Sequence, residues 1–208
     1  MGVSKKAPEI GTLNEGALHA ALKRHYGGAE AQFEVPFSGF VADVVRDDTI
    51  FEIQTSSFSG LERKMRALAD QNPVVLVHPI AAQKNLVRIK DPASGDFTRR
   101  KSPKKGKLCH ILSELVYLPS LLNHPNFSVE VALIEEEQHS IYDPKARRGR
   151  GGWRTRGRHL VELLEQLRIN DVHDLLQFVQ KPLAATFSVQ DLAAAMQQPV
   201  WLARQMAY

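Results

Sequence analysis

The order of local hydrophobic patterns restricts what this chain can fold into more than any other feature of its sequence. Residues 12–27 carry apolar side chains at helical spacing, and three short segments rich in β-branched residues follow between residues 31 and 57. Residues 59–71 again have a helical apolar face, and residues 73–80 form a continuous apolar run. Such a run is typical of a strand covered on both faces. The order helix, three strands, helix, strand predicts an α/β core.

Local end signals support these elements. Thr12 or Asn14 can cap the first helix, and the glycines at positions 27 and 28 can end it. An Asp47-Asp48 pair separates the second and third strand segments at hairpin distance. We therefore expect the three strands to form an antiparallel meander.

The remainder of the chain divides into an extension and a helical tail. Residues 109–125 have a helical pattern until Pro119 interrupts it, and residues 127–142 predict a long strand. From His159 onward the pattern is helical throughout. We predict a first domain over residues 1–158, made of a core at 12–80 and an extension with basic loops at 81–158. A small all-α domain would occupy residues 159–208.

The strand segments carry an acidic pattern. Asp43 lies near the centre of the second segment, and Glu52 and Gln54 are spaced i, i+2 on the third, so that their side chains share one face. Across the hairpin they would form an oxygen-rich cluster, to which the Ile53 carbonyl adds a ligand and Glu15 of the first helix a further carboxylate. Hard divalent cations such as Mg²⁺ or Mn²⁺ prefer such oxygen ligands.

A structural interpretation of the same pattern stays open. Acidic residues that alternate with apolar ones are typical of the solvated face of an antiparallel sheet. Here, however, the acidic residues are flanked by Val, Ile and Phe. A solitary carboxylate in such surroundings is costly unless it is paired or metal-bound.

Basic residues concentrate in two stretches, although the net charge is only +4. Such clusters favour phosphate and predict nucleic-acid binding, whereas a solvated basic loop is the alternative. A tryptophan within the second stretch could stack on an unpaired base or pack against its own domain. The first stretch comprises Arg99, Arg100, Lys101, Lys104, Lys105 and Lys107, and the second Lys145, Arg147, Arg148, Arg150, Trp153, Arg154, Arg156 and Arg158.

The order of elements, with Asp43 in the hairpin and Glu52-Ile53-Gln54 on the next strand, resembles the αβββαβ core of the PD-(D/E)XK nuclease superfamily, the restriction-endonuclease-like fold. The resemblance spans roughly residues 12–80 and implies a mixed sheet flanked by helices, with Asp43, Glu52 and Glu15 at a Mg²⁺ site. Gln54 departs from the family pattern, which usually has a lysine there to position the attacking water. Lys64 on the following helix could supply that cation, or could be an exposed helix charge.

The carboxy-terminal residues resemble the helix-turn-helix of winged-helix domains. Ser188 is placed to cap one helix and Pro199 to begin a second, which carries Arg204 toward solvent or DNA. The sequence stops at Tyr208, before any β-wing. We therefore expect a truncated winged-helix-like module that contacts DNA, or a module that serves for packing or protein contact.

Several function classes have no support in the sequence. The single Cys109 cannot form an internal disulfide or a cysteine-rich zinc site and is most simply a core residue, and no phosphate-cradling GxxxxGK[ST] loop is present. No apolar run approaches about 20 residues, so we expect a soluble, cytoplasmic, nucleoid-associated prokaryotic protein without a membrane partner.

Together these patterns predict a Mg²⁺-dependent nuclease that hydrolyses phosphodiester bonds of duplex, single-stranded or branched DNA. A homodimer is one arrangement that would cut both strands of a duplex. The alternatives are a catalytically inactive DNA-binding or regulatory protein on a degenerate nuclease core, and an RNA-directed or structural partner protein.

Overall fold

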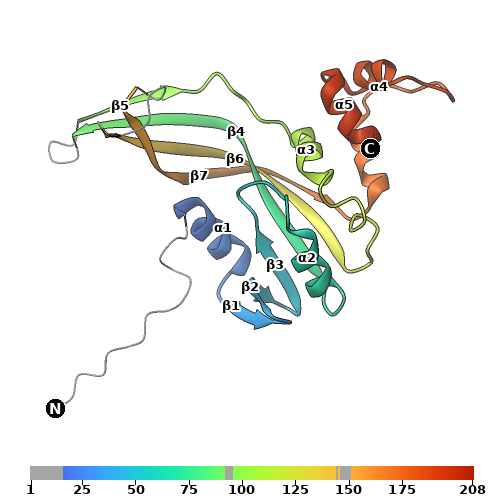
Figure 1. The fold of residues 1–208 in the computed structure, drawn as a ribbon, viewed down its shortest axis with the longest axis horizontal. Helices are drawn as coiled ribbons and strands as arrows, with labels where there is room; N and C mark the ends of the chain where they lie inside the picture. The colour runs from blue at the N-terminus through green and yellow to red at the C-terminus, as the bar shows by residue number, and fades with distance from the viewer. Residues whose placement is uncertain (1–15, 92–95, 144, 146–150) are drawn as a thin grey trace, which may run out of the picture.

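The computed structural model describes residues 16–91, 96–143, 145 and 151–208. The described chain is an α/β structure in which helices flank a mixed seven-stranded sheet (Figure 1). In chain order the elements are α1 (Ala17–Gly27), β1 (Gln32–Phe37), β2 (Phe40–Arg46), β3 (Thr49–Ile53), α2 (Glu62–Ala69), β4 (Val74–Asp91), β5 (Asp96–Lys101), the 3₁₀ helix η1 (Leu108–Ile111), α3 (Leu112–Leu115), β6 (Phe127–Tyr142), β7 (Trp153–Ile169), the 3₁₀ helix η2 (Val172–Phe178), α4 (Val189–Met196) and α5 (Val200–Ala207).

The sheet has the strand order β1-β2-β3-β4-β6-β7, and β5 pairs with the far part of β4. Strands β1, β2 and β3 form the antiparallel meander that the sequence predicts. Helix α2 then carries the chain across to β4, which runs parallel to both β3 and β6. Strands β6 and β7 are antiparallel. The sheet is mixed because the parallel pairs β3–β4 and β4–β6 are joined by longer connections, through α2 and through the segment that contains β5, η1 and α3, whereas the antiparallel pairs are joined directly.

The first half of the chain follows its local signals. Leu18, Leu22 and Tyr26 of α1 recur at i, i+4 and i+8 and are all buried against the sheet. Gly28, with φ of 68°, ends this helix in a conformation that disfavours other residues. Asp47 and Asp48 both have positive φ and form the β2–β3 turn. The predicted caps Thr12 and Asn14 lie outside the described residues.

Strand β4 is longer than the apolar run predicts, because it continues as far as Asp91. It contains Pro79, which lacks a backbone N–H. The carbonyl of Val77 accepts a hydrogen bond from Gln54 N, so the backbone N–H and C=O groups of Val77 and of every second residue from it point toward β3 and the loop after it. The backbone nitrogen of Pro79 points to the same side, but Pro79 lies two residues beyond the Val77–Ile53 pair, where the β3 ladder ends. A proline is tolerated there because no ladder partner for its missing N–H is lost.

The prediction that the basic residues of the extension lie in loops is wrong for many of them, because these residues lie on strands. Beyond β3 the sheet continues as a four-stranded arm formed by β5, the far half of β4, β6 and β7 (Figure 1). Arg99, Arg100 and Lys101 lie on β5, and Arg154 and Arg156 lie on β7. The predicted helix at 109–119 is shorter than expected and consists of η1 and α3. The strand over residues 127–142 is confirmed as β6.

The helix predicted at residues 159–168 is also wrong, because this segment is part of β7 and pairs with β6. Three residues of β7 are skipped in the register, at positions 156, 161 and 164. Each skipped residue is a β-bulge that shifts the alternation by one position. Leu160 and Leu163 consequently both pack on the core that lies under α1, at a spacing of three that imitates a helical pattern. Strand β7 also runs across the predicted domain boundary at residue 158.

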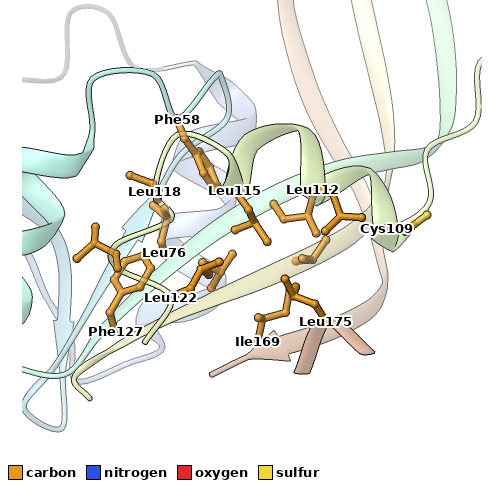
Figure 2. Packing of buried hydrophobic residues seen from close by; sticks show 14 of the residues in the cluster. Phe58, Leu76, Cys109, Leu112, Leu115, Leu118, Leu122, Phe127, Ile169 and Leu175 are labelled. Carbon is orange, nitrogen blue, oxygen red and sulfur yellow. The ribbon is translucent and has the colours of Figure 1, made fainter. Parts of the chain in front are cut away.

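Two hydrophobic cores cover the faces of the sheet, one beneath α1 and a larger one shared by α2, α3 and the carboxy-terminal helices. Figure 2 shows Leu112 and Leu115 of α3 packed with Ile169 of β7 and Leu175 of η2. Cys109 is buried in the same cluster, as expected. The predicted helices after Ser188 and Pro199 are confirmed as α4 and α5. None of the helices in the described chain is long and apolar enough to cross a membrane.

Candidate active site

Asp43 of β2 and Glu52 of β3 lie side by side where the ladder between the two strands ends. The ladder stops at the pair Val44–Phe51, and Asp43 and Glu52 are the next residues. There Glu52 Oε1 accepts a hydrogen bond from Asp43 N at 3.1 Å, and Asp43 Oδ2 accepts one from Ile53 N at 2.9 Å. Each carboxylate therefore satisfies a backbone donor of the opposite strand, which fixes both side chains in place.

Helix α2 brings Lys64 to this carboxylate pair. Met65 and Leu68 anchor the helix in the core, and Lys64 precedes the buried Met65. Its Nζ donates to Glu52 Oε2 at 2.6 Å, and its side chain retains 23% exposure. The sequence left two interpretations of Lys64, a cation at the site or an exposed helix charge. The second does not fit the structure, because the Lys64 ammonium group is paired with the buried Glu52 carboxylate.

Helix α1 contributes two further polar groups on the other side of Asp43. His19 Nε2 lies 3.3 Å from Asp43 Oδ2, and Lys23 Nζ lies 4.0 Å from Asp43 Oδ1. Lys23 is buried and also donates to Glu34 Oε1 of β1 at 2.9 Å. The carboxylates are thus placed between positively charged or ionisable groups from two helices.

The two carboxyl groups have opposite pKa shifts. Burial raises the pKa of Glu52 to about 7, the nearby charge of Asp43 adds to this effect, and Lys64 opposes it. Burial also opposes ionisation of Asp43, but hydrogen bonds from His19 and from Ile53 N outweigh burial and lower the pKa of Asp43. At neutral pH Asp43 therefore holds the firmer negative charge, and a cation placed at the pair would favour ionisation of both.

Gln54 does not join the carboxylates. Its Nε2 donates to Ser56 Oγ at 2.9 Å and to the Ser57 carbonyl at 2.7 Å, within the loop after β3. His78 Nδ1 lies 2.8 Å from the Gln54 carbonyl, and burial lowers the pKa of this imidazole. Arg158 of β7 donates to the Thr55 carbonyl at 2.7 Å. His78 and Arg158 of neighbouring strands thus hold this loop in place, and the Gln54 side chain forms hydrogen bonds within the loop.

The donor set fits a divalent cation that takes part of its ligands from substrate or water. Asp43 and Glu52 supply two carboxylates, and Mg²⁺ is commonly held by one or two carboxylates together with waters and phosphate oxygens. In the part of the chain that the structure describes, no three histidine, cysteine or carboxylate side chains form a metal-binding group. Glu15, the predicted third carboxylate, lies outside the described residues, and the carbonyl role predicted for Ile53 stays a prediction.

The predicted phosphate-binding residues lie far along the chain from this pair and differ in their contacts. Arg99 pairs with Glu137 at 2.8 Å, and Arg154 lies 3.8 Å from Asp143. Trp153 packs edge-on against Tyr142, with the Arg88 guanidinium 4.9 Å from its ring centroid, so it packs against its own domain. The side chains of Lys101, Lys104, Lys105, Lys107, Arg100, Arg156 and Arg204 are exposed, whereas Arg147, Arg148 and Arg150 lie outside the described residues.

Sequence reasoning missed His19 and Lys23 as neighbours of Asp43. Positions 15, 19 and 23 follow one another at intervals of four, and residues at this spacing share one helix face. If Glu15 reaches the site, then His19 and Lys23, on the same helix face, are also expected to lie near it. The pairing of Lys23 with Glu34 has no such signal, because Glu34 is on a different element.

Comparison with known proteins relates most of the chain to one family. A family model described as "Domain of unknown function (DUF8091)" matches residues 16–170, a range that contains all seven strands. An uncharacterized protein of Treponema pallidum (strain Nichols) is 31% identical over 185 residues, which cover 88% of this chain and 73% of that protein. No solved structure matches. Because the family model matches most of its length, the chain belongs to the DUF8091 family.

Proposed function

We propose that this protein is a metal-dependent nuclease that hydrolyses phosphodiester bonds in DNA. The observation that carries the proposal is the junction of β2 and β3, where Asp43 and Glu52 interlock through backbone hydrogen bonds and Lys64 contacts Glu52 at 2.6 Å. Paired buried carboxylates with an adjacent ammonium group are costly to assemble and are typical of catalytic sites.

The order of elements supports a PD-(D/E)XK, restriction-endonuclease-like core for this proposal. The meander β1-β2-β3 is followed by the crossover helix α2 and by β4 parallel to β3, which is the αβββαβ order of that superfamily. The acidic residues also lie on the second and third strands of the meander, at the positions that the resemblance implies.

In this proposal Asp43 and Glu52 hold Mg²⁺ or Mn²⁺. The bound ion lowers the pKa of a water ligand and offsets the charge that develops on the phosphate. Lys64 takes the role that a lysine at position 54 has elsewhere in the superfamily, because its Nζ lies at the carboxylate pair and the Gln54 amide is turned into its own loop. The Lys64 ammonium orients and stabilises a phosphate oxygen. His19 keeps Asp43 ionised and oriented.

The arm supports DNA as the substrate class. Exposed Arg100, Lys101 and Arg156 lie on its strands, and Lys104 and Lys105 follow β5. Arginine and lysine side chains of this kind contact phosphates independently of base sequence, and such binding weakens as the salt concentration rises.

The test is a cleavage assay on labelled duplex, single-stranded and branched DNA, with Mg²⁺ or Mn²⁺. We expect Asp43→Asn, Glu52→Gln and Lys64→Met each to lower the rate by about 100-fold or more, since each removes a charge at the reacting phosphate. Gln54→Ala should cost no more than about fivefold, which corresponds to one ordinary hydrogen bond. Glu165→Gln and Lys181→Met are the controls, because both side chains are exposed and distant in the chain from the site.

The pattern across the variants decides between the proposal and its rival. Metal-dependent cutting that is lost in the three site variants and kept in the two controls supports a nuclease with Lys64 in the site. A large loss in Gln54→Ala with activity retained in Lys64→Met would contradict the assignment of Lys64. Salt-sensitive DNA binding without cutting by the wild type, under any metal, would favour a catalytically inactive DNA-binding protein on the same core.

A further inference from the structure

The arm carries a pocket that the proposed catalytic site does not use. It has a volume of about 630 Å³ and lies on one face of the four arm strands. Its apolar lining consists of Val87 and Ile89 of β4, Phe97 of β5 and Ile141 of β6. These residues share a face because the register places Val87 opposite Arg99, Ile89 opposite Phe97, and Ile89 opposite Ile141. The volume suits a small organic ligand or part of a larger one.

Phe97 is the unusual member of this lining. Its side chain is 62% exposed, and it lies on β5, which among the described strands pairs with β4 alone. Edge strands usually carry polar or charged residues that discourage further association. The other five residues of β5 follow this rule, since they are Asp96, Thr98, Arg99, Arg100 and Lys101. An aromatic ring exposed beside a pocket therefore offers a flat surface for a ligand.

The charges at the pocket define what kind of ligand suits it. Arg99 and Arg156 line the pocket together with the apolar residues. Arg99 Nη2 pairs with Glu137 Oε1 at 2.8 Å, which orients the guanidinium and leaves its other N–H donors for a ligand. Arg156 is exposed at a bulge of β7 and forms no ion pair with an acidic residue in the part of the chain that the structure describes. A flat apolar surface with two guanidinium groups complements a ligand with a planar ring and a phosphate.

We propose that this pocket binds one unpaired nucleotide of a single-stranded nucleic acid, with its base stacked on Phe97 and its phosphates held by Arg99 and Arg156. A base in a duplex is stacked on both faces and cannot present its ring to Phe97, so the pocket selects single-stranded segments. The inference rests on the proposed function only in taking nucleic acid as the ligand class.

A second copy of this chain is a weaker candidate for the same surface. Two chains that joined through their β5 edges would bring Arg99, Arg100 and Lys101 of each copy together. Like charges placed opposite each other in a sheet are destabilising. The same three positive charges instead attract a polyanion and favour its binding.

The pocket is separate from the carboxylate pair. Val77 of β4 pairs with Ile53 beside that site, and Val87 of the pocket lies ten residues further along the strand. At about 3.3 Å per residue this distance is roughly 30 Å. A stacked strand at about 3.4 Å per nucleotide needs about nine nucleotides to reach from one to the other. The pocket thus holds a single-stranded segment about nine nucleotides away from the bond to be cut, rather than the bond itself.

The test measures binding in EDTA by fluorescence anisotropy, with labelled (dT)12, (rU)12 and a 12-base-pair duplex as probes. We expect Phe97→Ala to weaken (dT)12 or (rU)12 binding about 5- to 100-fold, the range for one lost base–aromatic stack, and to change duplex binding less than about twofold. Phe97→Tyr should retain wild-type affinity. Arg156→Ala should lower the slope of log affinity against log salt by about 0.7. Phe187→Ala is the matched control, because this phenylalanine is 51% exposed in the carboxy-terminal region.

The outcomes separate this inference from the proposed function. Loss of single-strand affinity in Phe97→Ala, with retention in Phe97→Tyr and Phe187→Ala, supports the pocket even if no DNA is ever cut. Equal affinity of Phe97→Ala and the wild type, or an equal loss for duplex and single strand, would overturn it. A wild-type dimer in sedimentation that Phe97→Ala converts to a monomer, without a change in nucleic-acid affinity, would show that the surface joins two copies instead. Because Phe97 is largely exposed, circular dichroism should confirm that the variant is folded.

Discussion

At the scale of single residues, the carboxylate pair is held together against its own electrostatic repulsion. The Glu52 side chain is only 6% exposed and lies beside Asp43, whose pKa is lowered. Lys64 offsets part of the repulsion, and the backbone donors Asp43 N and Ile53 N offset a further part. Charged groups that are paired away from water contribute little to the stability of the fold, because their loss of hydration offsets their mutual attraction.

This charge predicts a pH dependence of stability. Because the pKa of Glu52 is raised from 4.5 to about 7 in the folded state, the folded protein binds more protons than the unfolded chain between these values. The contribution of Glu52 is fully present below about pH 4.5 and is lost as the pH rises through about 7. In Glu52→Gln this loss is absent. Relative to the wild type, the variant should gain up to about 3 kcal/mol of unfolding free energy between pH 5 and pH 8.

Urea denaturation in EDTA at the two pH values measures this difference. Glu165→Gln serves as the control, because the exposed Glu165 makes no side-chain hydrogen bond or ion pair with the residues that the structure describes. Its stability relative to the wild type should be the same at pH 5 and pH 8. A pH-independent difference between Glu52→Gln and the wild type would mean that Glu52 is ionised throughout this range.

At the scale of elements, capping residues define where the helices at the carboxy terminus begin and end. Ser188 Oγ accepts a hydrogen bond from Asp191 N, and the Asp191 carboxylate in turn accepts from Ser188 N at 2.8 Å. This reciprocal capping box begins α4. Gln197, with φ of 52°, ends the helix in the left-handed conformation before Pro199 and α5.

The capping box predicts a defined loss on mutation. Ser188→Ala removes the side-chain acceptor for Asp191 N and should lower the free energy of unfolding by about 1 kcal/mol. Urea denaturation followed by circular dichroism measures the change. Thr186→Ala, two residues earlier and also exposed, should stay within about 0.5 kcal/mol of the wild type. Equal effects of the two variants would mean that the cap contributes nothing to the folded state.

At the scale of the whole molecule, the carboxy-terminal helices and the sheet share one core. Leu192 and Met196 of α4 and Leu202 of α5 belong to the same buried cluster as Leu112 of α3 and Ile169 of β7. Ser113 Oγ also donates to Gln205 Oε1 at 2.9 Å, so the Gln205 side chain faces α3. These contacts couple the helices to the sheet energetically.

The shared core predicts that the described chain unfolds in a single transition. Trp153 lies on the arm and Trp201 on α5, so Trp153→Phe and Trp201→Phe each leave one fluorescent reporter. The reporters should show the same denaturation midpoint, because buried clusters that interlock unfold cooperatively. Leu202→Ala, which truncates a fully buried side chain, should lower both midpoints by the equivalent of about 2–5 kcal/mol. A shift confined to the Trp201 reporter would show that the helical region unfolds independently.

Much of the fold could be predicted from the sequence because its signals are local. Capping residues and apolar spacing correctly indicated α2, α4, α5 and the three strands of the meander, and the side chains at hairpin distance brought Asp43 and Glu52 together. The contact of Lys64 with Glu52 was only one of two interpretations, because the spacing of a helix does not state which strand it covers. The contacts of His19 and Lys23 with Asp43 were missed although both residues share the predicted helix face of Glu15, which was already expected to reach the site.

The sequence by itself determined the order of the elements from α1 to β4 and the residue types at the carboxylate pair, since both depend on patterns within a few neighbouring residues. Only the tertiary structure decided that residues 159–168 form a strand. Their leucines and glutamates favour a helix, but β6 offers a full edge of backbone hydrogen bonds, and the bulge at position 161 places Leu160 and Leu163 on the same face, toward the core. It also decided that Phe97, Arg99 and Arg156 meet at one pocket, because strand pairing joins residues that are far apart in the chain.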